Sequence, residues 1–194
     1  MAEESSGNLK KALQILSEKL GVLGIDYGLT GGMAAKAYGS ERSVRDVDIF
    51  FVKRDSDRIV EALQEYLKRG PGKEDKKYGS VWNIYFEIEG VTVEFISNAI
   101  FDINGRTYSF HPSFNLFKRV KEKEIEGVKL KALSAEDIVI LKSITQRGEE
   151  EGKHDIDDIL SICKNTPLDV GYLKRRAFNC NAQDRVVPFL KSLK

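Results

Sequence analysis

The sequence has few of the residues that cross-link a protein or anchor it in a membrane. Its 194 residues include only two cysteines, Cys163 and Cys180, and these form no C-x-x-C pair. We therefore expect neither a disulfide framework nor a zinc knuckle. No apolar run approaches the ~18 residues of a membrane span, and the N-terminus lacks the basic and apolar regions of a signal peptide. The sequence thus predicts a cytoplasmic protein with no membrane partner.

An excess of charge of one sign is also missing. Lys and Arg number 31 and Asp and Glu 30, a formal net charge of +1, so the whole-molecule charge does not indicate nucleic acid or membrane as a partner. The segment 171–194 is an exception, with six basic residues and one acid. Helical spacing places Lys174 and Arg175 on its solvent side, opposite Leu173 and Phe178. We predict a basic C-terminal face that could bind tRNA or another RNA, and the alternative is an ordinary solvated helix surface.

Hydrophobic periodicity predicts an α/β first part followed by a helical tail, and we place the division at residues 1–130 and 131–194. Strands are predicted at residues 25–29, 47–52, 107–110 and 124–131, with a hairpin at 81–97. Helices are predicted at residues 9–20, 33–38, 55–68, 155–163, 168–178 and 182–193. A further helix begins at Ser134, where S-x-x-D is typical of an N-terminal cap.

The stretch DVDIFF places two carboxylates in an otherwise apolar strand. Because residues i and i+2 of a strand point to the same side, Asp46 and Asp48 stand side by side. Carboxylates at this spacing can share divalent cations, and Mg²⁺ prefers carboxylates together with substrate phosphates. Glu94, in a second apolar strand, becomes a third acid if the two strands are neighbours. The alternatives are a strand end at which Asp46 caps a turn, and an outward-facing Glu94.

Gly31 and Gly32 lie between a predicted strand and a predicted short helix. A glycine pair at such a place lets the backbone approach a ligand closely. It also leaves the first N–H groups of the helix free to bind a phosphate. A plain tight turn explains the pair equally well.

These pieces together resemble a known family. The glycine pair, followed by R-x-x-x-D-x-D and a later acidic strand residue, is similar to the nucleotidyltransferase superfamily of the DNA polymerase beta type. The segment SAEDIVILKSITQRGEEEGKHDIDDIL resembles the K…R…K-D-x-x-D-h segment of nucleotidyltransferases related to the AbiEii toxins. The resemblance covers about residues 24–160. It implies an α+β fold, with a nucleotidyltransferase-like small mixed β-sheet backed by helices and a helical C-terminal part.

The resemblance also implies roles for particular residues. Asp46, Asp48 and Glu94 would be the catalytic residues and the ligands of Mg²⁺ or Mn²⁺, with Glu94 orienting or deprotonating the acceptor. The positions that would bind the nucleoside triphosphate are Gly31, Gly32, Arg42, Lys142, Arg147, Asp155 and Asp158.

The chain departs from the family pattern at three places. Val44 stands where the family often has Thr or Ser, so a hydroxyl is lost. His154 stands where Lys is usual, with Lys153 one place away, and the third acid is Glu where Asp is commoner. Structural alternatives remain for the tail, since Lys142 could be a solvated helix residue and Asp155 could cap a helix N-terminus.

The predicted function is that of a Mg²⁺-dependent enzyme which moves a nucleoside monophosphate, ATP being one candidate donor, from a nucleoside triphosphate to an acceptor hydroxyl. The alternative is a non-catalytic nucleotide-binding module, such as a component of a toxin–antitoxin pair. The intact acidic trio favours the enzyme, because clustered like charges are costly. The missing hydroxyl at Val44 and the mismatch at His154 favour the module. The sequence leaves the acceptor open among RNA, protein and small molecules.

Overall fold

The structure is a computed structural model, and it describes residues 2–191. Its strands are β1 (Tyr27–Thr30), β2 (Asp46–Phe51), β3 (Leu67–Lys76), β4 (Gly79–Ile88), β5 (Val91–Ile103), β6 (Arg106–Phe110), β7 (Lys121–Ile125) and β8 (Val128–Ala132). Its α-helices are α1 (Ala2–Leu23), α2 (Gly31–Ala37), α3 (Ser56–Ala62), α4 (Phe114–Phe117), α5 (Ala135–Thr145), α6 (Asp155–Asn165), α7 (Val170–Asn179) and α8 (Gln183–Lys191). The α+β class predicted from the sequence is confirmed.

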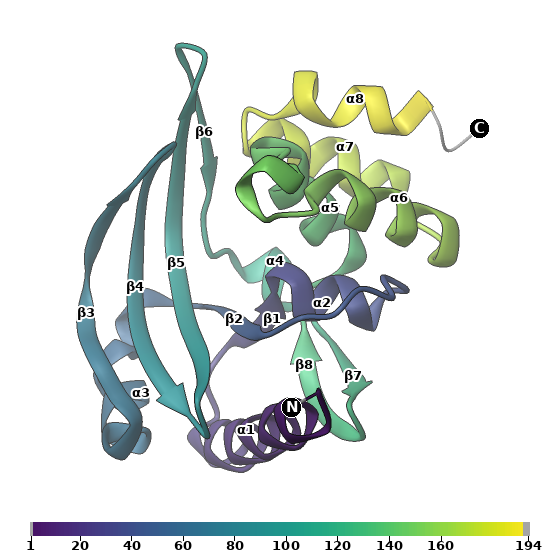
Figure 1. The fold of residues 1–194 in the computed structure, drawn as a ribbon. Helices are drawn as coiled ribbons and strands as arrows, with labels where there is room; N and C mark the ends of the chain where they lie inside the picture. Colours follow the sequence, from purple (N-terminus) through teal and green to yellow (C-terminus); the bar gives the residue numbers. More distant parts are fainter. Residues whose placement is uncertain (1, 192–194) are drawn as a thin grey trace.

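The strands form one mixed sheet in the order β3-β4-β5-β2-β1-β8-β7, and β6 pairs with β5 beside this path. Two pairings are parallel, β2 with β5 and β1 with β8, and the other pairings are antiparallel. Figure 1 shows the long strands β3, β4 and β5 as a tall curved wall, with α1 across its lower end and α5 to α8 gathered at its upper end. The sheet and the helical tail thus face each other.

The helix α1 covers the lower end of the sheet because its leucines repeat at helical spacing. Leu13 and Leu16 are fully buried and Leu20 is 1% exposed. They pack in one core with large apolar residues of the sheet, among them Phe50 and Phe95. No helix in the described part of the chain is both long and apolar enough to cross a membrane.

The predicted helix over residues 55–68 is wrong in its second half. The helix α3 ends at Ala62, and the chain enters the strand β3 at Leu67. This strand contains Gly70-Pro71-Gly72, a sequence that is typical of a turn after a helix. Proline is tolerated there because β3 is the edge strand of the sheet and its register with β4 shifts twice near this point.

The predicted strand over residues 124–131, which Gly127 interrupts, is a hairpin of two strands, β7 and β8. Glu126 and Gly127 both have positive φ, 51° and 75°, which is the backbone of a tight two-residue hairpin turn. The N-terminal cap of α5 is as predicted, since the side chain of Ser134 accepts a hydrogen bond from the backbone N–H of Asp137 at 3.2 Å.

The helix α5 joins the tail to the sheet. It packs against α6, α7 and α8 on the tail side and against α2 on the sheet side. Its apolar residues Ile138, Ile140 and Ile144 are fully buried in the same core as the sheet. The cleft described next lies between the upper part of the sheet and this helix.

Candidate active site

Three carboxylates meet on one wall of a cleft of about 380 Å³. Asp46 and Asp48 lie two residues apart on β2, and the parallel register of β2 and β5 places Glu94 directly beside Asp48. All three side chains line the cleft, together with Gly31 at the start of α2. The structure therefore brings together the three acids that the sequence analysis proposed.

The backbone turn at Gly31 lies directly against the carboxylate of Asp48 in this acidic wall. Gly31 has φ of 61°, a conformation that costs an L side chain energy, and a Cβ added there would collide with the carboxylate of Asp48. Glycine at this position thus lets β1, α2 and the acidic wall meet. Gly32 is buried behind this point, where a Cβ would collide with the guanidinium of Arg42.

We expect Gly31→Ala to cost about 1 kcal/mol for its backbone and a further ~1–2 kcal/mol for displacing Asp48. Gly24→Ala is the matched control, because Gly24 has φ of 59° but nothing within 4 Å of an added Cβ. Urea unfolding of both variants measures the difference. Equal losses of stability would show that the contact between residue 31 and Asp48 does not constrain the wall.

The carboxylate of Asp48 is perturbed by burial and by its acidic neighbours. Desolvation, with the neighbouring charges of Asp46 and Glu94, raises the pKa of Asp48 to about 7, although Lys153 and Arg147 oppose the shift. A carboxylate held at such a pKa is costly to ionise and gains from an added positive charge.

Each of the other two acids has a positively charged neighbour. Glu94 accepts a hydrogen bond from the side-chain amide of Asn83 at 2.7 Å, and the ammonium of Lys76 lies 3.4 Å away. The ammonium of Lys153 lies 3.9 Å from Asp46. Glu94 is thereby fixed in orientation by two residues of the neighbouring strands, while Asp46 remains half-exposed.

The carboxylates form an open site, and not a closed cage. Within residues 2–191, no group of three or more His, Cys, Asp or Glu side chains is arranged so that it could hold a metal ion without further ligands or movement. Mg²⁺ and Mn²⁺ are bound through oxygen, and Mg²⁺ usually retains waters and substrate phosphates among its ligands. The all-oxygen donor set and the raised pKa of Asp48 fit such a cation.

The five remaining predicted nucleotide-binding side chains fall into two groups. Lys142 and Arg147 line the cleft with the acidic wall. The other three lie outside the cleft lining, in ion pairs: Asp155 and Asp158 are 1% and 0% exposed, and Arg42 is paired with Asp158 at 3.0 Å. The structure thus brings only two of the five to the cleft.

The buried aspartates hold Lys142 between them. Its ammonium lies 3.1 Å from Asp155 and 2.7 Å from Asp158, and its side chain is only 5% exposed. Burial alone would raise the pKa of Asp155, but the charges of Lys142 and Arg147 lower it to about 2. Lys142 on α5, the two aspartates on α6 and Arg42 before β2 therefore form one network of ion pairs. The solvated alternative for Lys142 is wrong.

Sequence reasoning missed several residues of the cleft. Lys153 lines it beside Asp46, and the signal was its position one place from the lysine of the family motif. Lys77 and Tyr78, at the turn after β3, reach across to Glu151 at 3.2 Å and 2.5 Å. No signal could have found these two, because β3 itself was not recognised as a strand.

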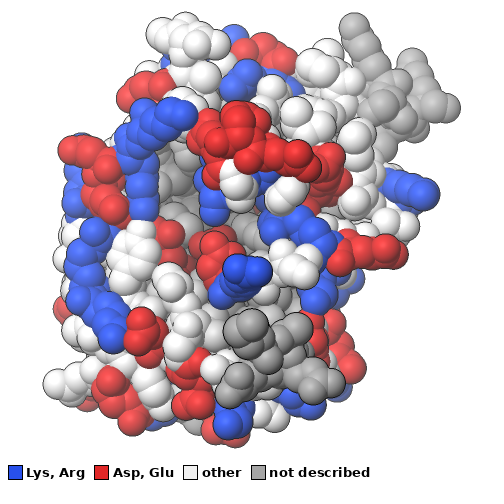
Figure 2. All heavy atoms as spheres, in the orientation of Figure 1, with Lys and Arg blue, Asp and Glu red and all other residues white. Residues whose placement is uncertain are grey.

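The predicted basic C-terminal face is only partly present. Lys174 and Arg175 are exposed, as predicted. Arg176 is buried against Asp137 at 3.1 Å, and Phe178, which was placed on the buried side, is 69% exposed. Lys194 lies outside the described residues. On the face shown in Figure 2, acidic and basic side chains are interspersed.

The chain as a whole belongs to a known family. The chain matches, over residues 9–191, the family described as nucleotidyl transferase of unknown function (DUF2204). No curated protein matches it.

Solved structures share the fold at low identity. TM1012 of Thermotoga maritima, described as a nucleotidyltransferase, is 18% identical with a TM-score of 0.59 over 72% of this chain and 85% of that one. The antibiotic-resistance factor ANT(2'')-Ia is 15% identical with a TM-score of 0.54 over 92% and 93%. A nucleotidyltransferase-like protein of Paracoccidioides brasiliensis is 21% identical with a TM-score of 0.51 over 96% and 92%. At these identities the likeness concerns the fold.

Proposed function

For a chain that belongs to the nucleotidyl transferase family DUF2204, we propose a divalent-cation-dependent transfer of a nucleoside monophosphate from a nucleoside triphosphate to a hydroxyl group. One observation carries this proposal: the parallel register of β2 and β5 sets Glu94 beside Asp48, so that three acids face one cleft. Clustered carboxylates that face substrate phosphates are the arrangement that metal-assisted phosphoryl transfer requires.

Asp46, Asp48 and Glu94 would hold the cation, Mg²⁺ or Mn²⁺. When bound, the cation supplies charge that polarises the phosphate under attack and stabilises the departing oxygen. Gly31, whose missing Cβ leaves room beside Asp48, would let the backbone at the start of α2 approach the triphosphate. Lys153 and Arg147, which both line the cleft, would offset the phosphate charge from the tail side.

In the proposed reaction, the acceptor oxygen attacks the α-phosphorus and forms a new P–O bond. The bond between the α-phosphorus and the bridging oxygen breaks, and pyrophosphate leaves. Glu94 is the residue placed to take the proton of the acceptor hydroxyl, because Asn83 and Lys76 hold its carboxylate in the cleft. The roles of Arg42, Asp155 and Asp158 are then indirect, since their ion pairs position Lys142 and the tail helices.

The proposal is tested first by binding and then by transfer. Mg²⁺ with each of the four nucleoside triphosphates should raise the melting temperature, and the best of them, labelled at the α-phosphate, should label an acceptor from a panel of tRNA, aminoglycosides and proteins. No stabilisation by any nucleotide, with Mg²⁺ or Mn²⁺ present, would contradict the proposal. ANT(2'')-Ia, whose structure with adenylyl-2''-tobramycin shares this fold, is the positive control.

We expect Lys153→Gln to raise the KM for the nucleotide about tenfold, because a charged contact to phosphate is lost, with a smaller effect on kcat. Lys164→Gln is the matched control, since Lys164 is an exposed lysine of the neighbouring helix α6 and does not line the cleft. Steady-state kinetics measure both variants. An unchanged KM for Lys153→Gln would remove Lys153 from the phosphate site.

A further inference from the structure

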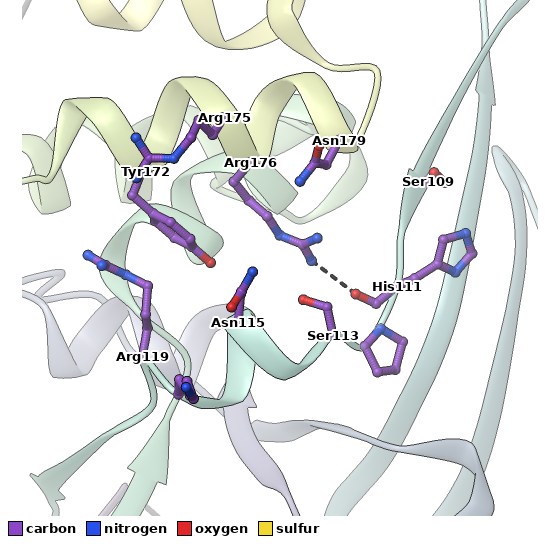
Figure 3. Close-up of a pocket in the computed structure, with 11 residues that line it drawn as sticks. Ser109, His111, Ser113, Asn115, Arg119, Tyr172, Arg175, Arg176 and Asn179 are labelled. Carbon is purple, nitrogen blue, oxygen red and sulfur yellow. Dashed lines mark hydrogen bonds between the residues drawn. The ribbon is translucent and has the colours of Figure 1, made fainter.

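A second cavity of about 660 Å³ lies between the segment that joins β6 to α4 and the helix α7 (Figure 3). Its volume is in the range of small-molecule sites. It shares no lining residue with the catalytic cleft, and none of its described lining residues is acidic. Four of them are basic: Lys118, Arg119, Arg175 and Arg176.

Carboxylates behind the cavity hold two of these arginines in place. Nε of Arg176 donates to Asp137 at 3.1 Å, and Asp137 is fully buried. Nη2 of Arg176 donates to the backbone carbonyl of His111 at 3.0 Å, the contact drawn in Figure 3. Nη2 of Arg119 lies 3.3 Å from Asp169. Both guanidinium groups are thus positioned before any ligand arrives, which lowers the entropic cost of binding.

The cavity lining also includes a buried donor that has no protein partner. Arg176 is only 7% exposed, with its Nε and Nη2 bound to Asp137 and to the carbonyl of His111. Nε of Arg119 is buried and has no hydrogen-bond partner in the described chain. Figure 3 shows Asn115 and Ser113 facing Arg176 and Tyr172 across the cavity. The walls therefore present fixed positive charge, together with neutral side-chain donors.

We propose that this cavity binds a small molecule through a phosphate group, at a site separate from the catalytic cleft. A guanidinium group presents paired N–H donors that match the oxygens of a phosphate, and arginine is favoured where such recognition is needed. The amide and hydroxyl side chains around the guanidinium groups can donate hydrogen bonds to the remaining oxygens of the phosphate. The site does not depend on the proposed transfer reaction, because it uses neither the acidic wall nor the metal.

The concave shape favours a small ligand over a nucleic acid. The charge that defines the site lies inside a cavity, where Arg176 is buried. A polyanion docks best on an extended exposed surface of one sign. A free phosphate-bearing metabolite is therefore the ligand that the geometry fits.

The test is isothermal titration calorimetry with inorganic pyrophosphate in the presence of a chelator, so that no metal site can form. We expect one equivalent to bind, and Arg175→Gln and Arg176→Lys to weaken binding about tenfold or more. Arg175 is at the surface, so its variant should fold normally. Arg54→Gln is the control, since Arg54 is 77% exposed and outside both cavities.

Further titrations distinguish binding in this cavity from binding in the catalytic cleft or to RNA. Binding should survive Lys153→Gln, which removes a cation from the catalytic cleft, and citrate should bind more weakly than pyrophosphate. Loss of binding in Lys153→Gln, with no effect of Arg175→Gln or Arg176→Lys, would place the anion in the catalytic cleft and overturn the proposal. Absence of binding would overturn it too, as would binding only to a single-stranded RNA oligonucleotide.

Discussion

Replacing Asp48 by asparagine is expected to reduce nucleotidyl transfer about 10³-fold and, at the same time, to raise the stability of the metal-free protein above pH 7. The loss of activity follows from the removal of one carboxylate from the proposed cation site, a change worth several kcal/mol in the transition state. The gain in stability follows from the raised pKa of Asp48, about 7, which burial and two neighbouring acids produce.

The sign of the stability change follows from proton binding. Between about pH 4 and pH 7 the folded wild type holds a proton on Asp48 that the unfolded chain has released, because the folded pKa is raised. The contribution of Asp48 to the free energy of unfolding of the wild type therefore falls as the pH rises through this range, and this contribution levels off once the pH is above the folded pKa. The asparagine of the variant does not titrate, so the advantage of the variant should grow from pH 4 to pH 7 and reach on the order of 4 kcal/mol.

Thermal melting across pH 4 to 8, with and without Mg²⁺, measures both effects. Mg²⁺ should restore stability to the wild type above pH 7 and have little effect on Asp48→Asn, because the cation competes with the proton. Asp75→Asn is the control, since Asp75 is 85% exposed on β3 and lies outside the cleft lining. A variant less stable than the wild type at pH 8, or a wild type indifferent to Mg²⁺, would contradict the metal-site proposal.

The second large effect is expected at Lys142. Lys142→Met keeps most of the length of the unbranched side chain and removes its charge, which leaves Asp155 and Asp158 buried without their central partner. Breaking a buried ion pair in this way typically costs about 3–5 kcal/mol. The structure thus predicts a loss of stability, where the sequence analysis expected a nucleotide contact at this residue.

The pH dependence gives this prediction a second readout. With Lys142 present, the pKa of Asp155 is lowered to about 2, so its contribution to stability is full above the unfolded pKa and is lost as the pH falls toward 2. Without Lys142 the buried carboxylates gain by taking up protons. The deficit of the variant relative to the wild type should therefore shrink as the pH is lowered from 7 to 4.

Urea unfolding of Lys142→Met and of the control Lys129→Met measures the effect. Lys129 is 71% exposed and 3.8 Å from Glu122, a surface pair that should contribute less than about 1 kcal/mol. Equal stabilities of the two variants would show that Lys142 is free to bind the nucleotide directly.

The sequence by itself predicted the structure best where a local rule applies. The period of a strand placed Asp46 and Asp48 on one side, and the family resemblance pointed to Glu94 as the third acid. The S-x-x-D pattern marked the start of α5 at Ser134. The edge strand β3 was missed because glycine and proline in its sequence indicate a turn, and only pairing with β4 makes a strand of it. The division at residues 130 and 131 stays a prediction.

The tertiary structure decided what depends on contacts between distant segments. Periodicity could not show that Arg176 is buried against Asp137, since their ion pair joins two helices 39 positions apart in the chain. The same holds for the cavity between α4 and α7 and for Lys142, which two aspartates of another helix enclose. Local sequence determines which way a side chain points from its own element. Whether that direction leads to solvent, a ligand or an ion pair depends on how the elements pack, because burial and charge pairing are properties of the assembled fold.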